Sequence, residues 1–237
     1  MRAVFLCSLL TIAIAGCNNQ GNNDSGENKG DVAPVSVTPI IPYTIINTYP
    51  HDTAYFTEGL EFYNGHLYES SGGNLSESPY PSAIGIVNLQ TGKNETKITL
   101  DRSRYFGEGI TFFRGELYQL TWRSGTGFVY HAGNFKKIKE FRIPSPEGWG
   151  LTHDSTQLYM SDGSSNIYVL QPDSLRILRT ITVNDESGPV SNINELEFVN
   201  GIIYANQWLS PYVLRIDPSN GKVTGKLDLT AISSQLE

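Results

Sequence analysis

The sequence predicts an all-β fold of the β-propeller type, and two observations lead to that prediction. One segment recurs four times, as EGLEFYNGHLY from Glu58, EGITFFRGELY from Glu108, WGLTHDSTQLY from Trp149 and NELEFVNGIIY from Asn194. The third residue of each copy is an aliphatic anchor; successive anchors are 50, 41 and 45 residues apart, and each precedes a tyrosine by eight residues. A strand–turn–strand repeat of this length is typical of propeller blades. A propeller places equivalent residues in rings around one channel, so residues that break the repeat are candidates for a functional site.

Each repeat divides into four predicted strands. The first pair is joined by a tight turn, for which Asn64-Gly65 and Asn200-Gly201 are favourable because both residue types tolerate positive φ. The third strands read IGIVNL, FVYHAG, IYVLQP and YVLRID, and the closing strands read ETKITLD, KIKEFRI, ILRTITV and KVTGKLDL. Four strands in about 45 residues match the size of one blade. We expect an additional strand over residues 43–50, which would complete the last blade and close the ring.

Residues 1–16 are predicted to be a lipoprotein signal peptide. Arg2 is followed by an apolar run that is too short for a transmembrane helix and typical of a signal-peptide core. The run ends with the sequence IAGC, which resembles a bacterial lipobox. The resemblance implies cleavage before Cys17, acylation of its thiol and a protein anchored in the bacterial cell envelope, on a periplasmic or outer-membrane face. An ordinary secretory signal with an incidental cysteine is the alternative.

The rest of the chain is predicted to be a flexible tether over residues 17–41 and one propeller domain over residues 42–237. The tether begins with a stretch rich in Asn, Gly, Asp and Glu, a composition that buries little apolar surface. The chain has 237 residues, a formal charge of −7 and 11% aromatic residues. These values favour a single globular domain, expected to be a monomer, and disfavour a nucleic-acid partner, which would need a basic surface. Neither the two cysteines nor the four histidines have the spacing of a metal site, and we expect no cofactor.

Two repeat positions hold unusual residues. The position two residues before each anchor is occupied by Glu58, Glu108, Trp149 and Asn194. The position four residues after each tyrosine is occupied by Gly72, Trp122, Gly163 and Trp208. Since blade packing requires none of these large or charged residues, we expect two carboxylates, one carboxamide and three indoles to meet at one mouth of the channel, with the glycines leaving room.

Such a group of residues suits a small polar ligand with a reacting amide or ester. Indole faces exclude water, and a desolvated carboxylate with a raised pKa is a suitable proton shuttle near neutral pH. Asn194 could orient or polarise a carbonyl group. The competing interpretation is structural: Glu108 would be a hydrogen-bonded residue at a strand end, and the tryptophans would pack between blades.

At these residues the chain resembles the plant-type and bacterial glutaminyl-peptide cyclotransferases, or glutamine cyclotransferases. The matching stretches are YPHDTAYFTEGLEF, YFGEGITFFRGELYQLTW, EGWGLTHDSTQLYMSDGS, INELEFVNGIIYANQW and RIDPSNGKVTGKLDL. The resemblance implies a five-bladed β-propeller that converts the N-terminal glutamine of peptides to pyroglutamate and releases ammonia, without a metal. It implies that Glu108 is the catalytic acid/base, that Asn194 binds the reacting amide, and that three indoles line the pocket. These indoles are Trp122, Trp149 and Trp208.

Two features depart from the family pattern. Glu58, expected among the substrate-binding residues, stands where the family commonly has glutamine. The family also has a fifth repeat, which carries a lysine at the position of Trp122, and the sequence to Glu237 contains four repeats. We therefore expect an incomplete last blade in this chain.

Two other functions remain open from the sequence alone. The first is a non-catalytic, lipid-anchored propeller that binds peptides or glycans through the same cavity. The second is a calcium-dependent propeller hydrolase resembling lactonases, for which Glu58, Glu108 and Asn194 could serve as ligands, although this leaves the tryptophans unexplained.

Overall fold

The computed structural model describes residues 37–76 and 78–233, which contain four antiparallel four-stranded sheets, here called blades 1 to 4. Blade 1 contains β1 (Phe56–Tyr63), β2 (His66–Gly72), β3 (Ala83–Val87) and β4 (Asn94–Thr99). Blade 2 contains β5 (Gly107–Phe113), β6 (Glu116–Thr121), β7 (Thr126–His131) and β8 (Lys137–Arg142). Blade 3 contains β9 (Leu151–His153), β10 (Leu158–Ser161), β11 (Asn166–Leu170) and β12 (Ile177–Thr182). Blade 4 contains β15 (Ile193–Val199), β16 (Ile202–Gln207), β17 (Tyr212–Ile216) and β18 (Val223–Asp228).

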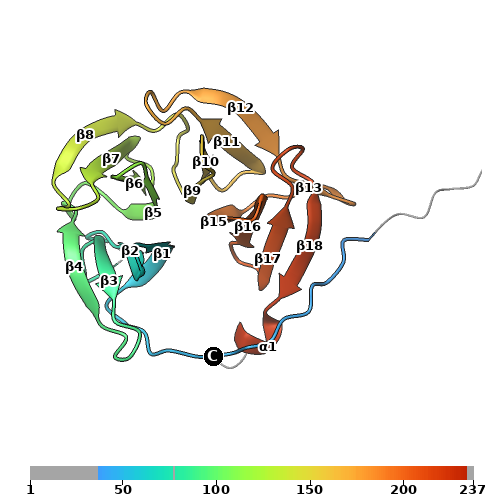
Figure 1. Ribbon diagram of the computed structural model, residues 1–237, viewed down its shortest axis with the longest axis horizontal. Helices are drawn as coiled ribbons and strands as arrows, with labels where there is room; N and C mark the ends of the chain where they lie inside the picture. The colour runs from blue at the N-terminus through green and yellow to red at the C-terminus, as the bar shows by residue number, and fades with distance from the viewer. Residues whose placement is uncertain (1–36, 77, 234–237) are drawn as a thin grey trace, which may run out of the picture. The chain divides into compact units, whose positions relative to one another are not determined.

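The strand order in each blade follows the chain, as the repeat predicts. The first strands β1, β5, β9 and β15 lie innermost, and the last strands lie on the outside (Figure 1). The predicted tight turns are confirmed, since Asn64 and Gly65 have φ values of 49° and 80°, and Asn200 and Gly201 have values of 49° and 83°. The chain therefore has an all-β, propeller-like fold with four blades, and a fifth blade is not shown.

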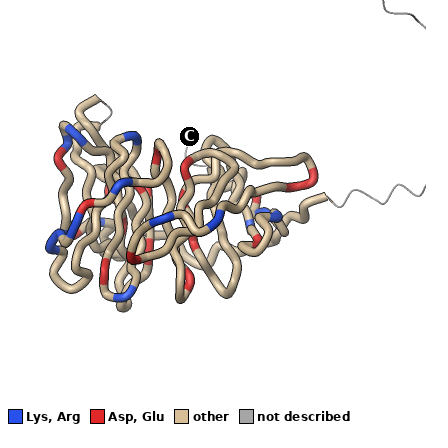
Figure 2. Tube along the Cα trace, turned by 90° about the horizontal axis from the view of Figure 1, so that it is seen from above, with Lys and Arg blue, Asp and Glu red and all other residues tan. Residues whose placement is uncertain are grey.

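Three hydrophobic clusters hold successive blades together. One joins blades 1 and 2 and includes Ile84 and Ile110; a second joins blades 2 and 3 around Leu120 and Met160. The third joins blades 3 and 4. Because each cluster takes residues from two sheets, a blade buries its faces only when it has neighbours. Lys and Arg residues are interspersed with Asp and Glu along the described trace (Figure 2).

The first inner strand exposes the face that its equivalents bury. Leu60 and Phe62 on β1 are 39% and 68% exposed, whereas their repeat equivalents on β5, Ile110 and Phe112, are 1% and 3% exposed. Within the described residues, blade 1 has a packed neighbour on one side only, which is blade 2.

The strand predicted over residues 43–50 is wrong, because these residues form no strand and are exposed to solvent. The pairing with the last blade occurs a few residues earlier. Ile41 N donates to Lys226 O at 2.8 Å and Lys226 N donates to Pro39 O at 3.0 Å, so this segment runs parallel to β18. Pro42 precedes residues 43–50 and Pro50 ends them, and proline has no N–H to donate to a β-ladder.

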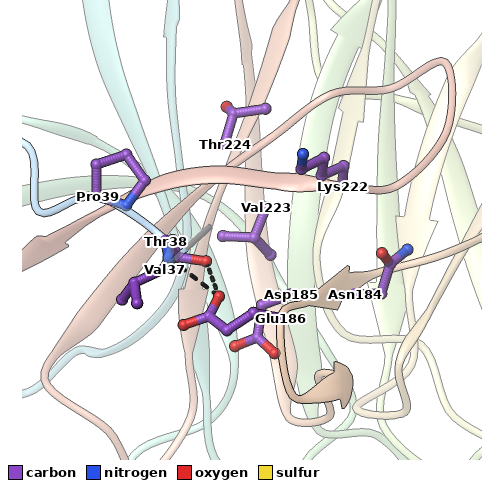
Figure 3. Close-up of a pocket in the computed structure, with 9 residues that line it drawn as sticks. All are labelled: Val37, Thr38, Pro39, Asn184, Asp185, Glu186, Lys222, Val223 and Thr224. Carbon is purple, nitrogen blue, oxygen red and sulfur yellow. Dashed lines mark hydrogen bonds between the residues drawn. The ribbon is translucent and has the colours of Figure 1, made fainter. Parts of the chain in front are cut away.

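A short hairpin that the sequence did not predict lies beside this pairing. It consists of β13 (Asn184–Asp185) and β14 (Gly188–Pro189), and Asn184 N donates to Gly221 O at 2.9 Å. At its turn, the Glu186 carboxylate accepts hydrogen bonds from the backbone N–H and the hydroxyl of Thr38 (Figure 3). The hairpin therefore fixes the start of the described chain against blade 4.

The described residues form one compact unit, and α1 (Thr230–Ser233) is its last element. The predicted signal peptide and Cys17 lie outside the described residues. In residues 37–76 and 78–233, no helix has the length and apolar character needed to cross a bilayer.

Candidate active site

Local irregularities in the inner strands aim the candidate side chains at the channel mouth. In β5 the register shifts between Gly107 and Ile110, and similar shifts occur around Glu58 in β1 and around Asn194 in β15. Such β-bulges insert an extra residue and redirect its side chain, and they are frequent beside active sites. The bulges therefore place Glu58, Glu108 and Asn194 at corresponding points of the three inner strands.

Glycines bring the inner strands close together next to this ring. A Cβ atom on Gly109 would lie 2.5 Å from the carbonyl oxygen of Trp149, and one on Gly150 would lie 2.2 Å from that of Asn194. Gly109 N also donates to Trp149 O at 2.8 Å. Only glycine permits this approach of two backbones, which brings the candidate residues of neighbouring blades to one place.

The six predicted pocket residues line a single cavity of about 180 Å³. They are Glu58, Glu108, Trp122, Trp149, Asn194 and Trp208, joined by Phe56 and Phe106. Of the two carboxylates, Glu58 and Glu108, Glu108 is the more deeply buried, with 5% of its surface exposed. Carboxylate, carboxamide and indole groups from all four blades therefore surround a space suited to one small polar group.

The aromatic rings pack edge to face around the cavity. Trp149 and Trp208 have ring centroids 5.6 Å apart at an interplanar angle of 84°, and Phe106 and Trp122 are 5.7 Å apart at 61°. The two glycines of the second ring make this packing possible. A Cβ atom on Gly72 would lie 2.2 Å from the Phe106 ring, and one on Gly163 would lie 2.5 Å from the Trp149 indole.

Glu147 holds two of the indoles in place. Its Oε2 atom accepts hydrogen bonds from Trp122 Nε1 at 2.8 Å and from Trp149 Nε1 at 2.9 Å, while its Oε1 atom accepts from Arg123 Nε at 2.7 Å. Burial would raise the pKa of Glu147, but the hydrogen bonds from Arg123, Trp149 and Trp122 outweigh this effect, so that the pKa is lowered. Glu147 thus remains ionised and fixes the orientation of both rings.

Sequence reasoning missed Phe56, Phe106 and Glu147, although the repeat contains a signal for them. All three lie two residues before the ring of Glu58, Glu108 and Trp149. Extending the comparison of the repeats by two residues would have identified a third ring of positions facing the mouth.

A second acidic group lies among the inner strands, at repeat positions next to the anchors. Burial raises the pKa of Glu61 to about 8 and that of Glu197 to about 7, and the pKa of Glu195 is also raised by burial. Phe112 N donates to Glu61 Oε2 at 2.7 Å. Burial therefore favours the neutral form of all three carboxyl groups, and Glu61 forms a hydrogen bond from blade 1 to blade 2.

The arrangement of the described side chains gives no support for metal binding. In the described part of the chain, no group of three or more His, Cys, Asp or Glu residues has an arrangement that could hold a metal ion. The alternative of a calcium-dependent hydrolase therefore gains nothing from the geometry.

The sequence model of the glutamine cyclotransferase family matches residues 9–237. The chain belongs to this family. A glutaminyl-peptide cyclotransferase from Arabidopsis thaliana is 34% identical over 215 residues, which cover 90% of this chain and 65% of the relative. The chain therefore spans slightly less than two thirds of the length of that relative.

Solved structures agree with this family membership. A crystal structure of Myxococcus xanthus glutaminyl cyclase superposes with a TM-score of 0.71 and 34% identity, covering 81% of this chain and 78% of the other. A chain in a nidogen/laminin complex superposes with a TM-score of 0.54 and 16% identity, covering 80% of this chain and 88% of the other. The second likeness concerns the fold alone.

Proposed function

We propose that the protein is a glutaminyl-peptide cyclotransferase that converts the N-terminal glutamine of peptides and proteins to pyroglutamate and releases ammonia. The observation that carries the proposal is the single cavity in which Glu108, Asn194 and three indoles meet. Membership of the glutamine cyclotransferase family supports it. A relative with that activity in its name and a glutaminyl cyclase of similar structure support it further.

In this reaction the α-amine of the substrate attacks the Cδ carbonyl of its own side chain. A bond forms between the amine nitrogen and Cδ, the bond from Cδ to the amide nitrogen breaks, and ammonia leaves. Glu108 accepts the proton that the amine loses and delivers a proton to the departing nitrogen. The Asn194 amide donates to the carbonyl oxygen as negative charge develops there.

Much of the rate acceleration in this proposal comes from holding the substrate in a folded conformation. Nucleophile and leaving group belong to one residue, and a correctly oriented intramolecular reaction can have an effective molarity of about 10⁵ M or more. The cavity of about 180 Å³ between Trp122, Trp149 and Trp208 suits a single compact residue. The indoles, two of them fixed by Glu147, exclude water from it.

The test is ammonia release from Gln-Ala-Ala-amide, coupled to mass spectrometry of the peptide product. The proposal predicts equal amounts of ammonia and pyroglutamyl peptide, and no reaction with Asn-Ala-Ala-amide, whose shorter side chain would have to close a strained four-membered ring. A folded protein that releases no ammonia from the glutamine peptide would contradict the proposal.

A non-catalytic, lipid-anchored propeller that binds peptides or glycans is the second candidate. The observation in its favour is an exposed aromatic rim, in which Phe56 and Trp208 are 65% and 48% exposed. Such rings can bind sugar or peptide faces without any chemistry. The same assay separates the candidates, because this one predicts binding of the glutamine peptide, seen as a change in tryptophan fluorescence, without ammonia release.

We also retain two predictions from the sequence as proposals. The lipobox at Cys17 supports anchoring in the bacterial cell envelope, and Cys17→Ala should release the protein from the membrane fraction of cells that express it. The exposed face of β1, with Leu60 and Phe62, supports a fifth blade in the intact family fold. A structure of an active, longer chain in which no sheet packs on β1 would contradict the second of these.

A further inference from the structure

A second cavity of about 380 Å³ adjoins the candidate active site. The two cavities share a wall formed by Phe106 and Trp122. The smaller cavity accommodates one residue, and the remainder of a peptide substrate has to pass out of it. The next residues of an extended peptide advance about 3.3 to 3.6 Å each, so the second or third residue after glutamine would cross this wall.

The second cavity has a cationic lining. Arg102, Arg104 and Arg123 all line it, and no Asp or Glu residue in the described part of the chain does so. Arg123 is paired with Glu147, so Arg102 and Arg104 supply the positive charge of this lining, which contrasts with the formal charge of −7 on the whole chain. An acidic peptide repelled by the overall charge would therefore find a favourable local potential at this cavity.

The guanidinium groups of two of the arginines stack on aromatic rings near the shared wall. The Arg123 guanidinium lies 4.0 Å from the centroid of the Trp122 ring, with its Nε atom bonded to Glu147. Arg104 lies 4.9 Å from the centroid of the Tyr105 ring, and its charge contributes to lowering the pKa of Asp101 and of Glu140. Stacked guanidinium groups keep their N–H edges available for a carboxylate.

The Arg102 side chain is held beside the loop that contains Ser78. Its terminal nitrogen donates to the carbonyl oxygen of Ser78, which fixes the side chain, but its Nε atom is buried and has no hydrogen-bond acceptor among the described residues. Arg102 therefore adds a fixed positive charge to the lining of the cavity.

A third cavity beside the site differs from this one. It shares Phe56 and Phe106 with the site and is otherwise lined by residues such as Ala54, Pro79 and Tyr80, and none of the described residues that line it is charged. It could accept the substrate chain but could not distinguish acidic from neutral residues. The two exits therefore predict different substrate preferences.

We propose that the arginine-lined cavity is a specificity subsite that binds a carboxylate of the substrate peptide at the second or third residue after the N-terminal glutamine. The inference rests on the proposed function, since it assigns the substrate's chain to that cavity. The carboxylate can belong to an acidic side chain or to the C-terminus of a short peptide. Guanidinium groups bind both through charge-assisted hydrogen bonds.

The experiment compares four peptides by kcat and KM: Gln-Ala-Ala-Ala-amide, Gln-Ala-Glu-Ala-amide, Gln-Ala-Gln-Ala-amide, and Gln-Ala-Ala with a free carboxylate. The glutamate peptide should have a kcat/KM about 10-fold higher than its glutamine twin, mainly through KM, because one charge-assisted contact is worth about 1.4 kcal/mol or more. Added salt should reduce the advantage. The free tripeptide shows whether a terminal carboxylate serves equally well.

The variant Arg104→Gln tests the assignment of the cavity. It should bring kcat/KM for the glutamate peptide close to that for the glutamine peptide, with the alanine peptide as internal reference. Arg176→Gln is the matched control, since Arg176 is exposed in the turn before β12 and does not line the cavity. The preference for glutamate should survive in this control.

Titration of tryptophan fluorescence with the same peptides separates the subsite from the chemistry. Turnover without a preference for glutamate would overturn the subsite and leave the proposed function intact. Tighter binding of the glutamate peptide that Arg104→Gln abolishes, without any turnover, would support the subsite and contradict the proposed function. A preference that Arg104→Gln leaves unchanged would overturn the subsite.

Discussion

Blades 1 and 2 contain nearly the same inner-strand motif, FTEGLEF and FGEGITF, in different surroundings. In blade 2 the strand lies between two sheets, and Glu108 and Ile110 are 5% and 1% exposed. In blade 1 the strand packs on one side only, and Leu60 is 39% exposed, while Glu58 is only partly buried. The motif therefore places a carboxylate at the mouth of the channel, whereas the neighbouring blades determine how strongly that carboxylate is desolvated.

The largest expected difference between the two motifs concerns activity. Glu108→Gln should reduce kcat by more than about 100-fold, because loss of a positioned general acid/base typically costs 10²–10⁴-fold. Glu58→Gln, the same change in the twin motif, should retain most of the activity, since the family resemblance places glutamine there. The measurement is kcat for ammonia release from Gln-Ala-Ala-amide, with circular dichroism as the folding control. Similar losses in both variants would show that the two carboxylates act together.

The next largest difference concerns stability. Ile110→Ala should lower the free energy of unfolding by about 2–5 kcal/mol, because it leaves a cavity in the cluster between blades 1 and 2. Leu60→Ala, at the equivalent position on β1, should cost less than about 1.5 kcal/mol, because the side chain is already partly exposed. Denaturant unfolding of both variants provides the measurement. Equal losses would mean that another surface covers β1 in solution.

The two blades also differ in the second ring, where blade 1 has Gly72 and blade 2 has Trp122, anchored by Glu147. Glu147→Gln should raise KM about 10-fold, since a hydrogen bond to a charged group is worth about 1.5–3 kcal/mol. It should also shift the tryptophan emission. Glu116→Gln is a suitable control, because Glu116 accepts a hydrogen bond from Tyr118 on another part of blade 2. An unchanged KM would mean that packing alone holds the indoles.

The smallest expected difference is a dependence of stability on pH. At the position after the anchor, blade 1 has Glu61 and blade 2 has Thr111. Burial raises the pKa of Glu61 to about 8, against about 4.3 in an unfolded chain. The folded state therefore binds more protons, and stability falls as the pH rises from about 4.5 to about 8.

Glu61→Gln should reduce this loss of stability, because the amide cannot ionise. Unfolding midpoints at pH 5 and pH 9 provide the measurement, and the change between them should be smaller in the variant than in the parent protein. A change of the same size in both would assign the pH dependence to other groups, such as Glu195 and Glu197, whose pKa values are also raised.

Much of the candidate site could be predicted from the repeat alone. The sequence identified six of the eight residues that line the pocket, because equivalent positions of a cyclic repeat converge on one axis. It did not identify Glu147, because the compared repeat positions began two residues after it, and only the structure shows the three N–H groups that donate to it. The catalytic roles of Glu108 and Asn194 stay predictions until turnover is measured.

By itself, the sequence determined the four strands of each blade, their order and two of their tight turns, because alternation and turn chemistry act over a few neighbouring residues. Only the tertiary structure decided that residues 39–41, and not 43–50, pair with β18, and that Leu60 is exposed where Ile110 is buried. The physical reason is the same in both cases. Strand pairing and burial depend on which distant segment supplies the partner, and the local sequence carries no record of that partner.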